Sequence, residues 1–532
     1  MNPPPEPAPL PPPAGAAVAP GGFAGRLKRL GSESLVYGLS SILGRFLGYL
    51  LQPFYASQFT TAENGVQTVV YTLLSLVSVV FVLGLDVGYM RSAAQPAPGE
   101  DGERGRQRAF TMSLALIAGG GAALLALGLL GVPWAARYFG VPPWALRYLL
   151  AIVYTDALLA VSWAHLRMTG RAMRFAVLRL AFVGISIALN LVLILGLRWG
   201  IEAIFLANLA ANGVLLALLA PDAARLLRPS LLRGDPGWGA LWRYALPIVP
   251  ASFAVLLVEN ADKLVLTRIS AELAREVYGL TPQQVVGSYG FNYKLGVVML
   301  LVVQTFRMAW TPFSLSHARD PGAPQLFSRV LTALMLVCGA VFLAASLLLP
   351  PLVRVPAVYH FAREPEYWAA LPIVPVVLLG YVFSGAYAVV TAGLYVEGRT
   401  GVLPWIAGLG AAVNVALCVL GMRWGMVAVA WATPVSYALM AALGAWQSGR
   451  VYPVPYEWGR MAHLGAVVGA VFWADAWLAG RGWEGTGAAE WGVKALLLLG
   501  YPLLLWGTRF FRAGEWRAMR SVLRRRGGSV RT

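Results

Sequence analysis

The five residues Gly196-Leu197-Arg198-Trp199-Gly200 return, with one change, as Gly421-Met422-Arg423-Trp424-Gly425. Each copy lies between two long apolar segments. The residues upstream repeat in the same order: Gly170-Arg171 then Asn190 before the first copy, and Gly398-Arg399 then Asn414 before the second. A repeat of about 225 residues that overlies hydrophobic segments predicts two similar membrane bundles joined in line, an arrangement typical of transporters.

The composition places the chain among helical membrane proteins. Of its 532 residues, 58% are hydrophobic and 12% are charged, whereas a soluble domain carries roughly 25% charged residues. Apolar runs of about 20 residues, each long enough to cross a bilayer, recur from end to end. The shorter alternating segments of a membrane β-barrel are absent from the sequence. We therefore expect an all-α polytopic membrane protein.

The apolar pattern predicts about fourteen membrane-spanning helices. Their expected positions are 33–58, 66–90, 109–132, 144–165, 175–197, 201–220, 241–266, 285–314, 330–350, 368–396, 402–420, 426–446, 460–480 and 489–508. The repeat makes spans one to six equivalent to spans seven to twelve and leaves the last two as an extra pair. An even number of spans per repeat gives both lobes the same orientation in the membrane.

The net charge of +18 has a topological explanation. The basic residues collect in alternate loops and in the tail after Arg509, and not on a soluble domain, so the charge does not indicate nucleic-acid binding. The positive-inside rule then predicts that both termini are cytoplasmic. The expected organisation is a disordered tail at 1–30, an N-lobe at 31–228, a C-lobe at 229–450, a helix pair at 451–508 and a basic amphipathic tail at 509–532.

Several stretches resemble the polysaccharide-flippase branch of the MOP superfamily, which also contains lipid II flippases and multidrug MATE exporters. One is Gly44-Arg45-Phe46-Leu47-Gly48 followed by Pro53, and another runs from Gly84-Leu85-Asp86 to Arg91. The most specific begins at Asn260-Ala261-Asp262-Lys263 and continues through Val286-Gly287-Ser288-Tyr289 to Tyr293-Lys294 and Ala309-Trp310-Thr311-Pro312. The resemblance covers about 31–510.

The resemblance implies two six-helix lobes that alternate in access around a central cavity. It also implies export of an undecaprenyl-pyrophosphate-linked oligosaccharide from the inner to the outer leaflet of the bacterial cytoplasmic (inner) membrane, for lipopolysaccharide O-antigen or a similar surface polysaccharide. A glycan polymerase or ligase is a possible partner, and we expect a monomer. Lipid II is an alternative cargo. An ion-coupled multidrug exporter is a second alternative, which the basic excess disfavours because cationic drugs would need an acidic cavity.

Charged side chains inside spans are costly, roughly 2.5–3.5 kcal/mol each, and need a partner or a wet cavity. Arginine suits bidentate phosphate contacts and lysine supplies a point charge, whereas tyrosine rings can stack on sugars. The predicted substrate-binding residues are Arg45, Gln52, Arg91, Lys263, Tyr289, Tyr293, Lys294 and Arg307. For several of these residues a structural role is the alternative. Lys263 could form a local ion pair or snorkel to the membrane interface, and Arg91 could be one of the cytoplasmic-side charges of the positive-inside rule.

The acidic residues within the spans could couple transport to H⁺ or Na⁺. They are Asp86, Asp156, Glu202, Glu259 and Asp262, of which Asp86, Glu259 and Asp262 are the predicted ion-coupling candidates. A role as counter-ion to an arginine is the alternative. The membrane potential alone would also draw an anionic head group outward. No catalytic residues, metal site or cofactor are expected. The short outer loops disfavour a membrane enzyme, and Cys338 and Cys418 lie in apolar segments as core residues.

Overall fold

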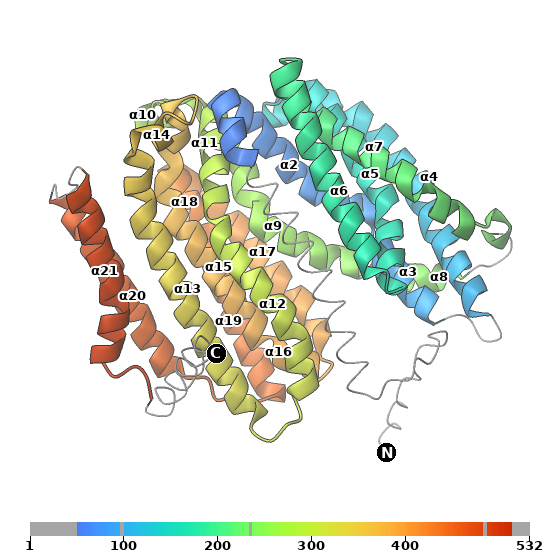
Figure 1. The fold of residues 1–532 in the computed structure, drawn as a ribbon. Coiled ribbons are helices and arrows are strands. Elements are labelled where there is room, and N and C mark those ends of the chain that lie inside the picture. The colour runs from blue at the N-terminus through green and yellow to red at the C-terminus, as the bar shows by residue number, and fades with distance from the viewer. Residues whose placement is uncertain (1–50, 96–100, 233–236, 482–486, 513–532) are drawn as a thin grey trace, which may run out of the picture. The chain divides into compact units, whose positions relative to one another are not determined.

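The chain is described by a computed structural model that covers residues 51–95, 101–232, 237–481 and 487–512. Within these ranges every regular element is a helix, as Figure 1 shows. This confirms the expected all-α class. The predicted tails at 1–30 and beyond residue 512, and most of the first predicted span, lie outside the described residues.

The helix bounds follow the apolar segments closely. The first group comprises α2 (Thr61–Val82), α3 (Leu85–Ala94), α4 (Gly102–Phe139), α5 (Pro143–Met168), α6 (Ala172–Leu191), α7 (Glu202–Leu226), α8 (Trp238–Ala245) and α9 (Ile248–Leu266). The second comprises α10 (Ala271–Tyr278), α11 (Pro282–Leu295), α12 (Val297–His317), α13 (Ala323–Arg354), α14 (Pro356–Tyr359), α15 (Val374–Val390), α16 (Ala392–Val396), α17 (Leu403–Gly421), α18 (Met426–Ala430), α19 (Ala432–Val451), α20 (Trp458–Gly480) and α21 (Ala488–Gly507). Shorter helical turns are η1 (Val192–Gly196), η2 (Pro229–Leu232), η3 (Pro365–Ile373), η4 (Thr400–Val402) and η5 (Met422–Trp424).

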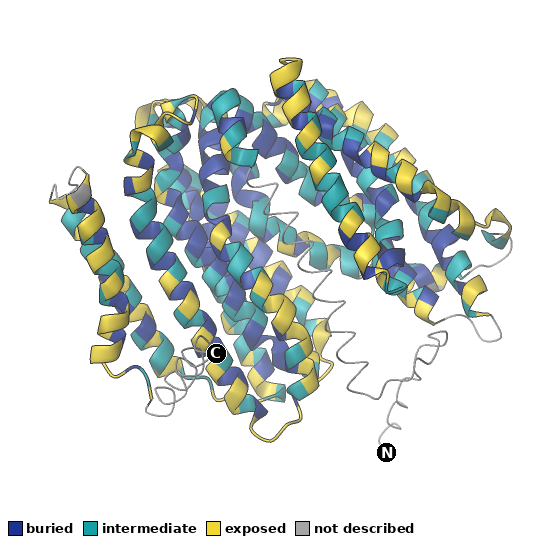
Figure 2. Ribbon diagram, viewed as in Figure 1, coloured by how far each residue is buried: buried dark blue, intermediate teal, exposed yellow. Residues whose placement is uncertain are grey.

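Twelve helical segments of the described chain are long and apolar enough to cross a membrane. They correspond to predicted spans two to thirteen, and α21 occupies the position predicted for span fourteen. Large apolar side chains remain exposed along these segments, as the yellow bands in Figure 2 show; Trp405, for example, is 81% exposed. Such surfaces suit contact with lipid, because hydrocarbon solvates apolar side chains as well as a protein core does.

Two predicted spans are each interrupted at a glycine. Leu83 and Gly84 both have positive φ, 51° and 68°, and separate α2 from α3. A Cβ atom at Gly84 would lie 2.8 Å from the carbonyl oxygen of Ala245 in α8, so this position combines a left-handed backbone with a close approach. Gly296 separates α11 from α12, and Val377 of α15 packs where its side chain would be. At each break, the helices before and after the glycine can run in different directions within one apolar segment.

The two copies of the repeated signature form turns between helices, although their conformations differ. In the first copy Arg198 has a φ of 55°. In the second copy Gly425 has a φ of 88°, and the neighbouring Met426 N–H donates to the Tyr278 hydroxyl across 2.9 Å. Each copy thus contains one residue of positive φ at its turn, an arginine in the first copy and a glycine in the second.

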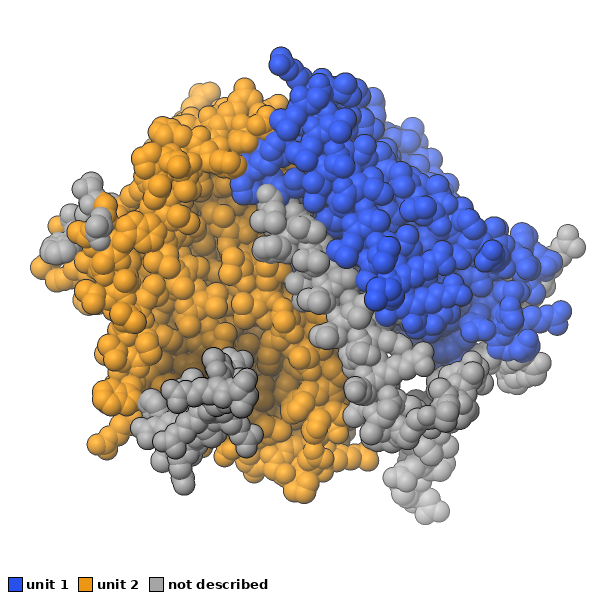
Figure 3. Space-filling view, in the orientation of Figure 1, with its two compact units in different colours: residues 1–54, 66–260 blue, residues 55–65, 261–532 orange. Residues whose placement is uncertain are grey.

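The chain divides into two compact units, coloured separately in Figure 3. Unit 1 contains residues 1–54 and 66–260, and unit 2 contains residues 55–65 and 261–532. The division falls within α9, so the last six residues of this helix belong to unit 2. Residues 55–65 also belong to unit 2, which means that the start of α2 packs with the second half of the chain.

In unit 1 the helices pack through glycine contacts and buried polar pairs. Gly88 of α3 lies against Leu241 of α8. Tyr89 and His165, from α3 and α5, share a hydrogen bond of 2.7 Å in which the hydroxyl oxygen and Nδ1 participate. These contacts join α3 to α5 and to α8.

In unit 2 the start of α2 crosses α11 at two glycines. Gly65 lies against the backbone of Gln283, and Gly287 lies against the backbone of Thr61. The Asn64 side-chain amide donates to the carbonyl oxygen of Gly287 across 2.8 Å. Small residues let helix backbones approach closely in membranes, so these glycines explain why residues 55–65 belong to the second unit.

Candidate functional site

A buried polar cluster lies between α9 and α11 in unit 2. The Tyr289 hydroxyl donates to Oδ2 of Asp262 across 2.7 Å, and Nζ of Lys263 donates to Oδ1 of the same carboxylate across 3.1 Å. Asp262 has no exposed surface and Lys263 is only 8% exposed. A buried charge pair persists only when hydrogen bonds satisfy its remaining atoms, and the tyrosine supplies one of these bonds.

Aromatic rings complete this cluster. Nζ of Lys263 lies 3.4 Å from the centroid of the Tyr293 ring, a cation–π contact. The Tyr293 ring meets Tyr289 at 6.0 Å and, at a steep angle, Tyr381 of α15 at 6.3 Å. Four of the predicted residues, Asp262, Lys263, Tyr289 and Tyr293, are thus brought together. Lys294 follows at the end of α11 and is half-buried.

The other predicted substrate-binding residues lie apart from this cluster along the chain. Arg307 is exposed on α12. Arg91 is exposed on α3, where its guanidinium lies 4.2 Å from the centroid of the Tyr244 ring in α8. Gln52 is half-buried in the helical turn before Pro53, and Arg45 lies outside the described residues. The exposed guanidinium groups are available to bind a phosphate without first breaking a buried ion pair.

Two predicted ion-coupling residues have partly exposed positions. Asp86 of α3 forms an ion pair of 3.7 Å with Arg167, at the end of α5. Glu259 is half-buried in α9, one turn before Asp262 and Lys263. No group of three or more histidine, cysteine, aspartate or glutamate residues within the described ranges could hold a metal ion.

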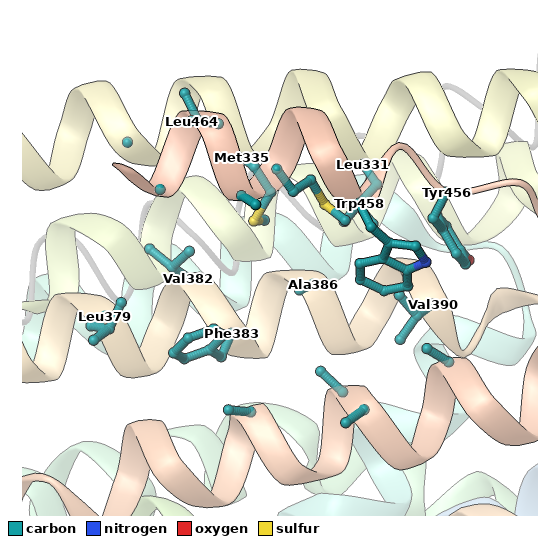
Figure 4. A pocket seen from close by; sticks show the side chains of 18 of the residues that line it. Leu331, Met335, Leu379, Val382, Phe383, Ala386, Val390, Tyr456, Trp458 and Leu464 are labelled. Atoms are coloured by element: carbon teal, nitrogen blue, oxygen red, sulfur yellow. The ribbon is translucent and has the colours of Figure 1, made fainter. Parts of the chain in front are cut away.

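The sequence reasoning missed a large apolar groove in unit 2. It has a volume of about 990 Å³ and is lined by α13, α15, α19, α20 and the segment that precedes α20. Figure 4 shows side chains such as Leu331, Phe383 and Trp458 around this space. Its lining is almost wholly apolar, so it suits a hydrocarbon chain better than a polar ligand.

Small residues on opposite walls explain why this space is open. On α19, residues 438, 441, 442 and 445 are alanines and residue 449 is glycine; on α20, residue 462 is alanine and residues 465 and 469 are glycines. Their spacing of three and four places each set on one helix face. This spacing could have indicated a small-residue face on each helix, but it does not distinguish close packing of the two faces from a groove between them.

Polar contacts attach α20 and α21 to α13 beside this groove. At one end, Glu457 accepts hydrogen bonds from Thr332 of α13, at 3.0 Å, and from Arg460, at 2.7 Å. At the other end Arg354 of α13 pairs with Glu490 of α21 across 3.0 Å, while Lys494 pairs with Asp475. Between them, Tyr501 donates to the carbonyl oxygen of Leu336. The pair therefore docks on α13.

Comparisons with known proteins identify the fold. No family model matches the chain, and no curated protein matches it. Among solved structures, the lipid II flippase MurJ in its inward closed conformation matches with a TM-score of 0.67 and 13% identity, over 90% of this chain and 100% of that one. A MATE-family multidrug transporter of the MOP superfamily, in its inward-facing conformation, matches with a TM-score of 0.62 and 14% identity, over 80% and 97%. The Vibrio cholerae MATE transporter VcmN in its bent form matches with a TM-score of 0.53 and 16% identity, over 81% and 98%. The chain therefore has the fold found in MOP-superfamily transporters.

Proposed function

We propose that this protein is an alternating-access transporter that flips an undecaprenyl-pyrophosphate-linked oligosaccharide from the cytoplasmic to the outer leaflet of the bacterial inner membrane. The flipped oligosaccharide would serve the synthesis of a surface polysaccharide such as the O-antigen of lipopolysaccharide. Both termini are cytoplasmic in this proposal. The solved structures of similar fold include both a lipid II flippase and multidrug transporters, so a transport role is supported by the fold and the cargo must be argued from the chain itself.

The apolar groove carries the argument for a lipid-linked cargo. The groove has a volume of about 990 Å³ and is bounded by four helices of unit 2. The alanines and glycines on two of these helices leave room for an unbranched or prenyl chain. A water-soluble cargo has no use for such a surface. A lipid-linked one must keep its tail in an apolar environment while its head group crosses the membrane.

Basic side chains provide the chemistry for the pyrophosphate. The exposed guanidinium groups of Arg91 and Arg307 can make bidentate phosphate contacts. Lys263 is already neutralised by Asp262, so it can meet the cargo only after this pair separates, and we assign the first phosphate contacts to the arginines. Tyr289 and Tyr293 are buried and would reach a sugar only in another conformation of the transporter.

Lipid II is the alternative cargo that a specific observation favours. The match to the lipid II flippase extends over 90% of this chain, compared with 80% for the MATE transporter. Both lipid cargoes share the polyprenyl pyrophosphate, so the groove and the arginines serve either. A multidrug exporter is the other alternative. Neither the net charge of +18 nor the apolar groove supports it.

A flipping assay with the purified, full-length protein tests the proposal. The protein would be reconstituted into vesicles that contain undecaprenyl-pyrophosphate-linked oligosaccharide or lipid II, and an enzyme added outside would report how much glycan becomes accessible. We expect protein-dependent exposure of the oligosaccharide lipid. Exposure of lipid II alone would identify the peptidoglycan precursor as the cargo. No exposure of either lipid, with export of a cationic dye, would contradict the flippase proposal.

A further inference from the structure

One end of the apolar groove in unit 2 carries aromatic side chains of the kind found at membrane interfaces. This aromatic end is formed by Trp446 of α19, by Trp458 at the start of α20 and by Tyr456 just before it. Figure 4 shows Tyr456 and Trp458 together at this end, away from Leu379. Trp446 and Trp458 are 53% and 57% exposed. Tryptophan and tyrosine are enriched where the hydrocarbon meets the lipid head groups, so we expect the aromatic end to lie at the level of the lipid phosphates.

The rest of the groove leads away from the aromatic end into apolar surroundings. Along α20 the lining extends from Trp458 to Phe472, which corresponds to about 21 Å at ~1.5 Å per residue. One leaflet contributes about half of a hydrocarbon core of ~30 Å. The groove is therefore long enough for a lipid chain that begins at one interface, and such a lipid would have its head group at the aromatic end.

Arg450 brings a positive charge to the aromatic end. Its guanidinium carbon lies 3.8 Å from the centroid of the Trp446 ring, one turn earlier on α19. The residue before it, Gly449, lines the groove. Arg450 is exposed in the last turn of its helix, and in the described part of the chain it belongs to no ion pair. Its charge is therefore available to a ligand in the groove.

The stacked arrangement prepares Arg450 to bind a phosphate. A guanidinium that lies on an indole presents its flat face to the ring, whereas its N–H donors point outward from its edge. Two of these donors can bind two oxygens of a phosphate at once. The contact with Trp446 also restricts the side chain before the ligand arrives, so less conformational freedom is lost on binding.

The carboxylate at this end of α20 does not oppose an anion. Glu457, one residue before α20, pairs with Arg460 across 2.7 Å and with Arg512 across 2.7 Å. Two guanidinium groups thus face one carboxylate and leave an excess of positive charge there. Together with Arg450, these residues make the potential at the aromatic end favourable for a negatively charged head group.

We propose that the aromatic end of the groove is a loading site, at which Arg450 binds the pyrophosphate of the lipid-linked cargo while its prenyl chain lies in the groove. In naming the cargo, the inference rests on the proposed function. The connection between α19 and α20 is cytoplasmic in the proposed topology, and the cargo is on this side before it is flipped. The loading site is distinct from Arg91 and Arg307, which are assigned the phosphate contacts during transport.

Lipid binding by the purified full-length protein tests the site, with native mass spectrometry in detergent as the measurement. The probes are undecaprenyl pyrophosphate and undecaprenol, which share the prenyl chain and differ in the phosphates. Arg450→Gln should weaken binding of undecaprenyl pyrophosphate by about tenfold, because it removes charge-assisted hydrogen bonds. It should leave binding of undecaprenol unchanged. Arg450 is exposed at a helix end, so the variant should keep the wild-type unfolding temperature.

Arg481→Gln is the matched control. Arg481 lies 4.0 Å from the centroid of the Trp477 ring, with the same spacing of four residues, at the end of α20. Neither of these two residues lines the groove, so Arg481→Gln should bind undecaprenyl pyrophosphate as the wild type does. Equal affinities of the wild type and Arg450→Gln, or equal losses in the two variants, would overturn the loading site.

Phosphatidylglycerol is the competitor that distinguishes cargo from ordinary phospholipid. We expect it to displace little undecaprenyl pyrophosphate at equal concentration, and full displacement would overturn the assignment to the cargo. The two proposals can also fail separately. Arg450-dependent binding by a protein that flips no lipid would contradict the proposed function alone, whereas normal flipping with binding that does not depend on Arg450 would contradict the loading site alone.

Discussion

The hydroxyl of Tyr289 donates a hydrogen bond of 2.7 Å to the carboxylate of Asp262, and both residues are completely buried. The bond joins α11 to α9 within unit 2. It also completes the environment of a carboxylate whose other oxygen faces the ammonium group of Lys263. These two residues therefore test whether the cluster is an integral part of the fold.

Tyr289→Phe should lower the free energy of unfolding by about 1–3 kcal/mol, because it leaves a buried carboxylate with one donor fewer. Tyr293→Phe is the comparison variant: it keeps the ring that Lys263 contacts and removes a hydroxyl whose hydrogen bond is with the Tyr381 side chain. Thermal unfolding in detergent measures both. Equal decreases in the free energy of unfolding for the two variants would contradict a particular contribution of the hydrogen bond to Asp262.

Lys263→Met should be more damaging, by roughly 3–5 kcal/mol, since it leaves the Asp262 charge buried and unpaired. The double variant Lys263→Met/Asp262→Asn removes both charges and should recover a large part of the loss. Comparison of the single and double variants in a double-mutant cycle gives the coupling energy. A double variant no more stable than Lys263→Met alone would contradict the buried-pair explanation.

Gly287→Ala should destabilise unit 2, because the added methyl group would meet the backbone of Thr61, which cannot rotate away as a side chain can. Gly408→Ala on α17 is the control. Nothing lies within 4 Å of its added methyl group, and alanine favours a helix by about 1 kcal/mol over glycine. Unfolding temperatures should thus move in opposite directions, and a stabilised Gly287→Ala variant would refute the close approach.

Arg307→Ala should abolish export of the surface glycan because it removes a proposed phosphate contact. It should not lower the amount of inserted protein, because Arg307 is exposed on α12. Arg45→Ala is expected to do the same, and Arg45→Lys separates charge from bidentate geometry. Surface glycan and membrane protein level would be measured in a strain that lacks the chromosomal copy. Normal glycan in both alanine variants would exclude the basic-site mechanism.

Ala442→Phe should reduce flipping severely while the protein folds, since the ring would occupy the groove beside α20. Ala466→Phe adds the same ring to an exposed position of α20 that does not line the groove and should flip normally. The vesicle assay described above measures both variants. Full activity of Ala442→Phe would remove the groove from the transport path.

The sequence by itself determined the all-helical membrane class and the positions of nearly all the spans, because segments that must satisfy their backbone hydrogen bonds in lipid have to be long, apolar helices. It also selected Asp262, Lys263, Tyr289 and Tyr293 as exceptional, since polar groups inside such segments are costly. It did not reveal that these four residues satisfy one another, because that depends on how α9 and α11 face each other.

Only the tertiary structure decided where space is left between the helices. The alanines and glycines of α19 and α20 could have allowed close packing as readily as a groove. Glu457 and Arg354 take part in the contacts between the helix pair and α13, and Lys494 joins α21 to Asp475 of α20. A hydropathy pattern indicates which residues avoid water, whereas a groove between helices depends on how whole helices are placed relative to one another.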